Sequence, residues 1–437
     1  MFVTIATFIF VLAVLVLVHE LGHFVAAKAY GIRVLEFGFG YPPRIFGIRR
    51  GETVYSLNLL PLGGFVKLVG EEDPTDPRSL ARRSPGVRVV VLGAGAFMNA
   101  LLPLVLFAAL FMVPQQTMVT DVVIMEVAAG SPAAMAGIQP GDAVLRIHNR
   151  SITNSLELRE TIQSRLGAET DWVGWRGGET YTARVVPRFK PPEGQGAVGV
   201  VIADARVSVA SVAPGSPAAA MGLQPGDAVL LVGETPIFYS EWLPVVLDDF
   251  RASDPGASVP VGVWRGGRVV ELALPADSVA QGQGIPGLEL AERPLERRSE
   301  PPWRAVPHAA SHMGTVLAAF KNEVGRWIVG AAPPQVAGPV GIAQLTGEVA
   351  RAGIIPLISF TALLSMNLAI LNILPIPMLD GGRLMFVLLE VVRGGKRVPP
   401  QKEGFVHLVG FVVLLSLIVV VTYFDIARIL RGESILP

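Results

Sequence analysis

The feature that most constrains this chain is an apolar run that passes without a break into two histidines and a glutamate, VLVLVHELGHFVAAKAYGI at residues 14–32. Residues 2–18 are almost entirely apolar, and a helix that continues through the histidines is long enough to cross a bilayer. Ionisable side chains are costly in hydrocarbon and mark functional sites there. The run therefore predicts a membrane-spanning helix whose polar end has a chemical function.

The spacing of His19, Glu20 and His23 is that of a metal-binding helix. Residues four apart share one face of a helix, so both imidazoles can hold one zinc ion. Glu20 is rotated by one position and reaches a zinc-activated water as a general base without ligating the metal. This is the H-E-x-x-H pattern of metalloproteases. A pair of satisfied structural histidines is the alternative, but such groups at the end of an apolar span need a compensating partner.

Composition restricts the class of protein further. Of 437 residues, 51% are hydrophobic and the mean hydropathy is +0.51, which indicates a membrane protein with soluble parts. The formal net charge is zero, so nothing favours nucleic acid as a partner. The chain has no cysteine, which excludes disulfides, thiolate metal ligands and a cysteine nucleophile. Any zinc must therefore be held by histidines and carboxylates.

Apolar runs long enough, or nearly so, to span a bilayer occur at 2–18 with its helical extension, 92–113, 354–374 and 405–424. The first lacks the basic start and the cleavage site of a signal peptide, so it is predicted to be retained. Lysines and arginines gather in 24–88 and 380–403, which places both segments on the cytoplasmic side. The N-terminus, residues 115–350 and the C-terminal tail are then expected outside.

An internal repeat fills the external segment. VAAGSPAAMAGIQPGDAVLRI (127–147) matches VAPGSPAAAMGLQPGDAVLLV (212–232), and a Trp-Arg-Gly-Gly hairpin follows in each copy. The two copies start at residues 127 and 212, so the period is 85 residues, which is the size of a small domain. The repeat resembles the PDZ domain in its circularly permuted bacterial form, with GAVGVVIA (196–203) and GIPGLELA (284–291) as ligand-binding loops and strands. Either the copies bind peptides by strand addition or they only pack and occlude. In the second copy, Pro286 removes a backbone donor from the candidate loop, which disfavours binding there.

The segment MNLAILNILPIPMLDGGRLMF (366–386) is expected to complete the metal site. Pro375 and Pro377 must break any helix that passes through them, and Asp380 follows at membrane depth. A carboxylate in that position is a candidate third zinc ligand. Capping of the next helix is the alternative role for Asp380.

Together these motifs make the chain resemble the site-2 protease family of intramembrane zinc metalloproteases, of the RseP type with tandem PDZ domains. The resemblance covers essentially the whole chain and is carried by HELGH, GAFMN (95–99), GPVGIAQLTG (338–347) and NILPIPMLDG (372–381). It implies one Zn²⁺ per chain, held by His19, His23 and Asp380, with Glu20 as the base. It also implies a set of residues near the substrate: Asn367, Asn372, Pro375, Pro377, Gly95 and Asn99.

The family resemblance also implies a membrane-associated β-hairpin between the first two spans, which residues 43–69 fit, with its turn at RRGET. A helical substrate hides its carbonyls in its own hydrogen bonds, so cleavage requires local unwinding. An exposed strand edge near the zinc would stabilise the unwound form by strand addition. The expected edge comprises Gly64, Phe65, Val66 and Lys67.

A second histidine pair, His308 and His312, has the same spacing, but no glutamate follows His308 and the setting is amphipathic. Residues 303–331 are therefore predicted to form an interfacial or surface helix. The expected fold is a polytopic α-helical membrane protein with about four transmembrane helices, the β-hairpin and two inserted α+β PDZ domains. The expected domains are 1–114 (first two helices), 115–205 and 206–295 (PDZ domains), 296–350 (amphipathic connection) and 351–437 (last two helices).

The expected function is zinc-dependent endoproteolysis of a single-span membrane protein, within or near its transmembrane segment, in regulated intramembrane proteolysis. By family resemblance the substrate is an anti-sigma factor already trimmed by another protease, and the PDZ pair gates access by size or by recognition of an end. The chain is expected to work as a monomer in the bacterial cytoplasmic (inner) membrane, with the zinc near the cytoplasmic face and the PDZ domains outside. An inactive membrane-anchored PDZ scaffold is the alternative, and the intact metal-site residues favour the enzyme.

Overall fold

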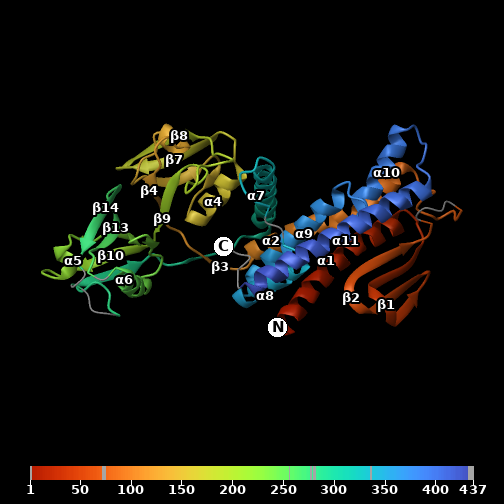
Figure 1. The fold of residues 1–437 in the computed structure, drawn as a ribbon, viewed down its shortest axis with the longest axis horizontal. Coiled ribbons are helices and arrows are strands. Elements are labelled where there is room, and N and C mark those ends of the chain that lie inside the picture. Colours follow the sequence, from red (N-terminus) through yellow and green to blue (C-terminus); the bar gives the residue numbers. More distant parts are fainter. Residues whose placement is uncertain are drawn as a thin grey trace. The chain divides into compact units, whose positions relative to one another are not determined.

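The computed structural model describes residues 2–70, 75–254, 256–275, 278, 282–334 and 337–431. The chain divides into two compact units. The first comprises Met1–Val113, Glu300–Ala310 and Gln335–Pro437, and the second comprises Pro114–Ser299 and Ser311–Pro334. The long apolar helices belong to the first unit and the sequence repeat belongs to the second (Figure 1).

Four helices of the described residues are long and apolar enough to cross a membrane, as the sequence predicts: α1 (Phe2–Ala29), α2 (Pro85–Met112), α9 (Ile354–Ile373) and α11 (Pro400–Leu430). Helix α2 is central, because it packs against both α1 and α9. Close packing of α1 on α2 depends on Gly22, where a Cβ would lie 2.7 Å from the Ala94 carbonyl carbon. These contacts bring the H-E-x-x-H segment of α1 against the middle of α2.

Two shorter helices complete the first unit, α8 (Pro339–Ala352) and α10 (Asp380–Val392). The N-terminus of α8 is held to α11, since the Gly341 N–H donates to Oδ2 of the buried Asp425 at 2.8 Å. Gly338 leaves room for that carboxylate, because a Cβ there would lie 2.7 Å from the same oxygen. Helix α9 ends at Ile373, shortly before Pro375 and Pro377, and α10 begins at Asp380.

A curled two-stranded sheet precedes α2. Its strands are β1 (Val34–Arg50) and β2 (Thr53–Leu68), joined by a tight turn. The predicted turn is present, but the sheet begins before residue 43, and β1 pairs along both of its edges: Glu36 lies opposite Lys67 on one side and Val54 on the other. The segment 64–68 therefore forms an outer edge of the sheet. That part of β2 packs against α1, which brings the edge near the histidines.

The second unit contains two copies of one topology. The strand order of the first sheet is β8-β7-β5-β4-β9, and the short β6 pairs with β5. The strand order of the second sheet is β14-β13-β11-β10-β15, and the short β12 pairs with β11 in the same way. The elements of the first copy are β4 (Asp121–Val127), α3 (Pro132–Met135), β5 (Ala143–Ile147), β6 (Arg150–Ser151), α4 (Ser155–Ser164), β7 (Thr170–Arg176), β8 (Glu179–Val185) and β9 (Val200–Ala205). Those of the second are β10 (Val207–Val212), α5 (Pro217–Ala220), β11 (Ala228–Val232), β12 (Thr235–Pro236), α6 (Trp242–Ser253), β13 (Val259–Arg265), β14 (Arg268–Leu274) and β15 (Leu288–Glu292).

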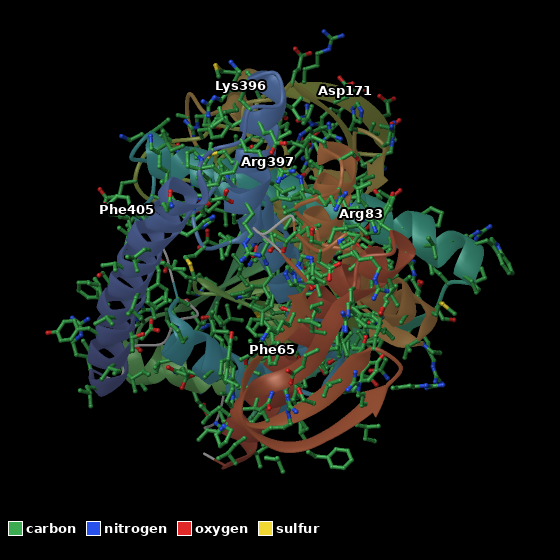
Figure 2. The ribbon with its side chains drawn as sticks, turned by 90° about the vertical axis from the view of Figure 1, so that its right-hand side faces the viewer. Phe65, Arg83, Asp171, Lys396, Arg397 and Phe405 are labelled. Carbon is green, nitrogen blue, oxygen red and sulfur yellow. The ribbon has the colours of Figure 1, made fainter. Side chains whose placement is uncertain are left out.

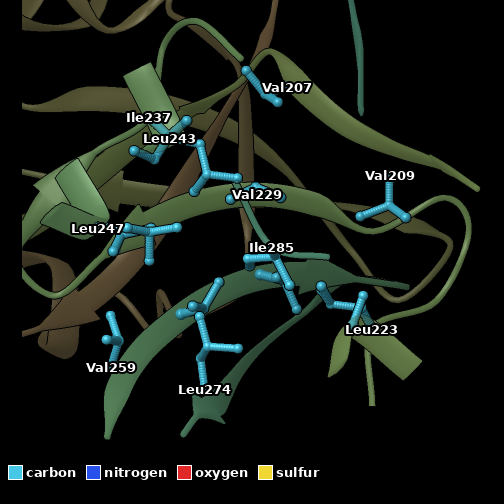
Figure 3. Close-up of a cluster of buried hydrophobic side chains, with 14 residues drawn as sticks. Val207, Val209, Leu223, Val229, Ile237, Leu243, Leu247, Val259, Leu274 and Ile285 are labelled. Atoms are coloured by element: carbon cyan, nitrogen blue, oxygen red, sulfur yellow. The ribbon is translucent and has the colours of Figure 1, made fainter. Parts of the chain in front are cut away.

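The repeated sequence motifs make the same contacts in both copies. Ser131 and Ser216 each cap a short helix through the hydroxyl. The Asp of each Gly-Asp pair bonds the Arg of the following Trp-Arg-Gly-Gly hairpin: Asp142 with Arg176 and Asp227 with Arg265. Each copy has its own apolar core. Figure 3 shows the second, in which Leu243 and Leu247 of α6 face the strands.

The outer faces of the two sheets also pack together through a separate buried cluster that includes Val123, Ala203 and Leu230. At its margin Trp264 Nε1 donates to the Gly141 carbonyl oxygen at 3.0 Å. A short ladder of β3 (Gln115–Thr117) with β16 (Glu296–Arg298) closes the base of the pair. Helix α7 (Pro302–Ile328) follows, close to the predicted surface helix at 303–331.

Candidate metal centre

The two histidines of α1 point their Nε2 atoms at one place. Nε2 of His19 lies 3.2 Å from Nε2 of His23. Nδ1 of His23 lies 2.8 Å from the carbonyl oxygen of Val91, to which it donates. That hydrogen bond selects the tautomer whose Nε2 lone pair is free for a metal, a common arrangement at metal-binding histidines.

Asp380, the first residue of α10, contacts both histidines. Its Oδ2 lies 3.0 Å from Nε2 of His19 and 3.1 Å from Nε2 of His23. The N-cap position of α10 is Leu379, and the carboxylate of Asp380 is turned toward the histidines. Within the described residues these three make the one group of His, Cys, Asp and Glu side chains arranged to hold a metal ion. A residue more than 350 positions away in the sequence thus joins the histidines.

The residues present fit a zinc ion. Tetrahedral zinc with bonds of about 2.0–2.1 Å holds its ligand atoms about 3.3 Å apart, close to the separations seen here. Two imidazoles and one carboxylate are a donor set of catalytic zinc sites, which leave a fourth position open. Nδ2 of the Asn99 side-chain amide lies 3.3 Å from Nδ1 of His19, and Oδ1 of Asn99 is buried without a partner. When the amide is turned over, Oδ1 accepts from Nδ1–H, both groups are satisfied and Nε2 of His19 is free for the metal.

Gly95 lets α2 approach the two imidazoles. A Cβ built on Gly95 would lie 2.6 Å from Nε2 of His19, and it would also overlap Nε2 of His23. Real Cβ atoms do not approach other atoms so closely, so any side chain here displaces a histidine. Gly95 and Asn99, both predicted near the substrate, therefore lie directly against the proposed ligands.

Glu20 faces the edge of the β-sheet. Its carboxylate is half-buried and accepts a hydrogen bond from the backbone of Val66 on β2. Gly64 is also close, because a Cβ there would lie 3.3 Å from Cγ of Glu20. The predicted edge residues Gly64 and Val66 thus lie beside the predicted base, and Lys67 is exposed. Figure 2 shows Phe65 on the same strand.

A cavity of about 210 Å³ opens beside His19 and Glu20. Its other lining residues are Leu15, Val16, Tyr41, Gly63, Gly64, Asn99, Leu368 and Asn372. Of the three asparagines predicted near the substrate, Asn99 and Asn372 line this cavity, whereas Asn367 is exposed on α9 and does not. Pro377 packs against α11, where a Cβ on Gly410 would lie 3.2 Å from the Pro377 carbonyl carbon. Glu20 and His19 are therefore both reachable from this cavity.

Sequence reasoning missed Tyr41 and Val91. The ring of Tyr41 lines the cavity and covers Gly63, where a Cβ would lie 2.9 Å from the ring. No local pattern connects Tyr41 with the histidines, because the pairing of Tyr41 with Leu60 brings it there. Val91 acts through its carbonyl oxygen, which its side-chain type does not reveal. The second histidine pair is engaged elsewhere, since His308 bonds Glu300 at 2.9 Å and stacks on Phe111.

The fold and these convergent ligand atoms define the class of the chain as a metallopeptidase. The chain belongs to peptidase family M50, because the model of that family matches residues 7–417. The predicted membership of the site-2 protease family is therefore confirmed.

Relatives match along almost the whole chain. The zinc metalloprotease RasP of Geobacillus kaustophilus is 30% identical and the alignment covers 97% of this chain and 98% of RasP. The regulator of sigma-E protease RseP of Escherichia coli is 28% identical over 97% of this chain and 98% of RseP. The regulator of sigma-W protease RasP of Bacillus subtilis is 29% identical over 98% of this chain and 99% of that protein.

Among solved structures, the PDZ domain of an SdrC-like protein from Listeria monocytogenes matches 20% of this chain and 93% of its own length. The sequence identity is 20% and the TM-score is 0.18. The assignment of the two repeats as PDZ domains therefore rests on their own sequence and strand order, and it belongs to the proposal below.

Proposed function

We propose that this chain is a zinc-dependent intramembrane endopeptidase that cleaves single-span membrane proteins within or near their transmembrane segment. One observation carries the proposal: Nε2 of His19, Nε2 of His23 and Oδ2 of Asp380 converge beside Glu20 on a helix apolar and long enough to cross a membrane. The names of the relatives, zinc metalloprotease among them, support zinc as the metal. An inactive scaffold would have no use for this set of side chains.

The residues of the site divide the chemistry among them. A bound zinc ion supplies Lewis acidity toward the peptide carbonyl and the attacking water. Glu20 accepts the proton of that water and delivers it to the leaving amine. Val91 and Asn99 orient His23 and His19, while Asn372 lies where it can donate to the substrate carbonyl. The apolar wall of the cavity, with Leu15, Val16 and Leu368, limits water around the scissile bond.

The outer edge of β2 is suited to holding an unwound substrate. The backbone of Val66 bonds Glu20, so its polar groups face away from β1. Side chains and hydrogen-bonding groups alternate along a strand, so the polar groups of Gly64 face the same way. A substrate segment that adds to this edge presents an extended peptide bond beside Glu20. Pairing with this edge would therefore stabilise the unwound form of a helical substrate.

The basic segments 24–88 and 380–403 favour an arrangement with the metal site toward the cytoplasm and both repeats outside. Residues 115–205 and 206–295 are proposed as two PDZ domains with the permuted strand order. Their free edge strands, β9 and β15, lie at the ends of the sheets, as a PDZ peptide site requires. We place the chain as a monomer in the bacterial inner membrane. Relatives named as regulators of sigma-E and sigma-W proteolysis support an anti-sigma-factor-like substrate.

The test is co-expression of the chain with candidate single-span membrane proteins, wild type against Glu20→Gln. Wild type should produce a shortened substrate fragment in the membrane fraction, and Glu20→Gln should not, because a neutral amide cannot accept the proton. Equal cleavage by a membrane-inserted Glu20→Gln variant would exclude the proposed role of this residue.

A further inference from the structure

A buried network of charges lies in the first unit, at the opposite end of α10 from the metal centre. Arg88 in the first turn of α2 donates from Nη2 to Oε2 of Glu390, and both side chains are less than a tenth exposed. Oε1 of Glu390 accepts from Nε of Arg397 at 3.3 Å. Arg397 also donates to the carbonyl oxygen of Ala81. The three side chains tie the end of α10 to the start of α2. Figure 2 labels Arg397 and also Arg83, which lies two residues after Ala81 in the chain.

Stability alone is a weak reason for such a network. Burying a carboxylate and a guanidinium carries a desolvation penalty that their attraction offsets only when the geometry is good. Apolar side chains of similar volume often serve the fold as well. An ion pair differs from an apolar contact in being directional, so it fixes one register where apolar surfaces tolerate sliding.

The register of α10 matters because the helix begins at Asp380. Ten residues separate Asp380 from Glu390, which is about 15 Å along the helix. Between them Leu384 and Val387 of α10 pack in an apolar cluster that includes Ala27 and Val91. A slide or rotation of α10 along that surface moves Oδ2 of Asp380 away from the histidines.

Helix α2 is the common support of the whole centre. Arg88 precedes Val91 by three residues, so the helical turn that holds Glu390 also presents the carbonyl oxygen that orients His23. One turn of α2 therefore contacts His23 directly, and it contacts the helix that carries Asp380 through Glu390.

We propose that Glu390, held by Arg88 and Arg397, is a positioning residue that sets the register of α10 and thereby places the Asp380 carboxylate at the metal. The inference rests on the proposed function, in which Asp380 is a zinc ligand. It assigns a role in metal binding to a residue about 15 Å along α10 from Asp380.

The first measurement is the rate at which purified, detergent-solubilised protein releases zinc to a chelator. Glu390→Gln keeps the shape of the side chain and removes its charge. We expect release about tenfold faster than in wild type, the size of effect seen when outer contacts of metal ligands are lost. The matched control is Glu323→Gln, which removes the charge from another Arg–Glu pair, with Arg326 at 3.0 Å on α7. Its release rate should equal that of wild type.

The second measurement separates positioning from plain stability. Arg88→Met combined with Glu390→Met replaces the pair by apolar side chains and should restore the unfolding temperature. Zinc release should remain fast in this double variant, and the visible spectrum of the Co²⁺-substituted protein should differ from wild type, because the register is no longer fixed. A merely structural network predicts wild-type release and a wild-type Co²⁺ spectrum once stability is restored.

A milder variant covers the case in which the buried substitutions prevent folding. Arg397→Gln removes only the outer, partly exposed arm and should give a smaller but measurable increase in zinc release. Wild-type release in Arg397→Gln, or in the folded Glu390 variants, overturns the inference. If Asp380→Ala loses zinc while Glu390→Gln behaves as wild type, only this inference fails. If wild type binds no zinc, or Asp380→Ala retains it, the proposed function fails as well.

Discussion

The carbonyl oxygen of Val91 lies 2.8 Å from Nδ1 of His23, so the second long helix orients a histidine of the first. The same helix brings Asn99 to His19 at 3.3 Å and leaves space for both imidazoles at Gly95. One helix therefore sets the tautomer of His23 and contacts both histidines. The metal centre depends on the packing of α1 on α2 as much as on the H-E-x-x-H spacing.

Gly95→Ala tests that dependence. The added methyl group would lie 2.6 Å from Nε2 of His19, so the imidazoles must move and zinc affinity should fall by about tenfold or more. Zinc per chain after equilibration with a competing chelator measures the effect. Gly93→Ala is the matched control, since a Cβ on Gly93, in the same helix, meets no atom within 4 Å. Equal zinc retention by the two variants would contradict the arrangement.

Metal binding and catalysis should separate at two neighbouring carboxylates. Asp380→Ala removes a proposed ligand and should lower both bound zinc and cleavage. Glu20→Gln should keep the zinc and lose cleavage by about 10²–10⁴-fold, as expected for a general base. Elemental analysis of both purified proteins decides the assignment, with His308→Ala as the histidine control. Unchanged zinc in Asp380→Ala would remove that residue from the ligand set.

The sequence predicts the parts of the site that depend on local spacing. His19, Glu20 and His23 lie within two helical turns, and Asp380 was predicted from the broken helix around Pro375 and Pro377. The positions of Val91 and Tyr41 depend instead on pairings between distant segments, namely α1 with α2 and β1 with β2. No property of either side chain indicates such a partner.

The boundaries of the helices and strands were also predicted imperfectly from the sequence. The second span was predicted to start at residue 92, but α2 begins at Pro85. Arg88 lies in the first turn of this helix, and its charge is paired with the distant Glu390 inside the protein. Likewise, the hairpin was predicted at 43–69, whereas β1 begins at Val34 and runs through the prolines at 42 and 43. Tertiary contacts, which the sequence does not display, decide both cases.

Thiol labelling of single cysteines should reveal the orientation in the membrane. Glu169→Cys and Glu234→Cys place a thiol at exposed positions of the first and second repeats, and Arg82→Cys places one at an exposed position before α2. The native chain has no cysteine, so background labelling is absent. An impermeant reagent added to intact cells should label the two repeat positions but not position 82. The reverse pattern would invert the proposed orientation.

The ion pair between Asp142 and Arg176 should make the first repeat sensitive to acid. Burial alone would raise the pKa of Asp142, but hydrogen bonds from Arg176, Tyr181 and the Gln139 N–H outweigh it and hold the pKa below the ordinary value of 3.8. The stability that this pairing contributes is therefore present above about pH 4 and is lost as the pH falls from there through the lowered pKa.

Asp142→Asn should remove the same contribution at neutral pH, about 2 kcal/mol for the lost hydrogen bonds to a charged group, because Arg176 is 36% exposed and remains solvated. Hydrogen exchange of β5 and β7 in the intact chain measures it, and the difference from wild type should shrink in acid. Asp171→Asn is the control, because the Asp171 side chain is 57% exposed and lies 3.8 Å from Arg184. Equal exchange in the two variants at neutral pH would show that the pairing at Asp142 contributes little.

Deletion of residues 121–295 should reveal whether the repeats act as a gate. Thr117 of β3 pairs with Glu296 of β16, so the ends left by the deletion already lie side by side, and a short glycine-rich linker can join them. If the repeats exclude substrates by size, the deletion variant should cleave a single-span protein that still carries its folded external domain. Wild type should cleave only the trimmed form.

Recognition of a peptide end predicts a different pattern, and Gly199 distinguishes the two. Gly199 has φ of +75° and its N–H and carbonyl close the candidate peptide-binding loop, so Gly199→Val must distort that loop. End recognition predicts that this variant no longer cleaves the trimmed substrate, whereas size exclusion predicts near wild-type cleavage. We expect exclusion, because Pro286 removes a backbone donor from the equivalent loop of the second repeat. A stable deletion variant that cleaves trimmed substrate and still refuses the full-length protein would rule out the gate, since nothing of the repeats would remain to exclude it.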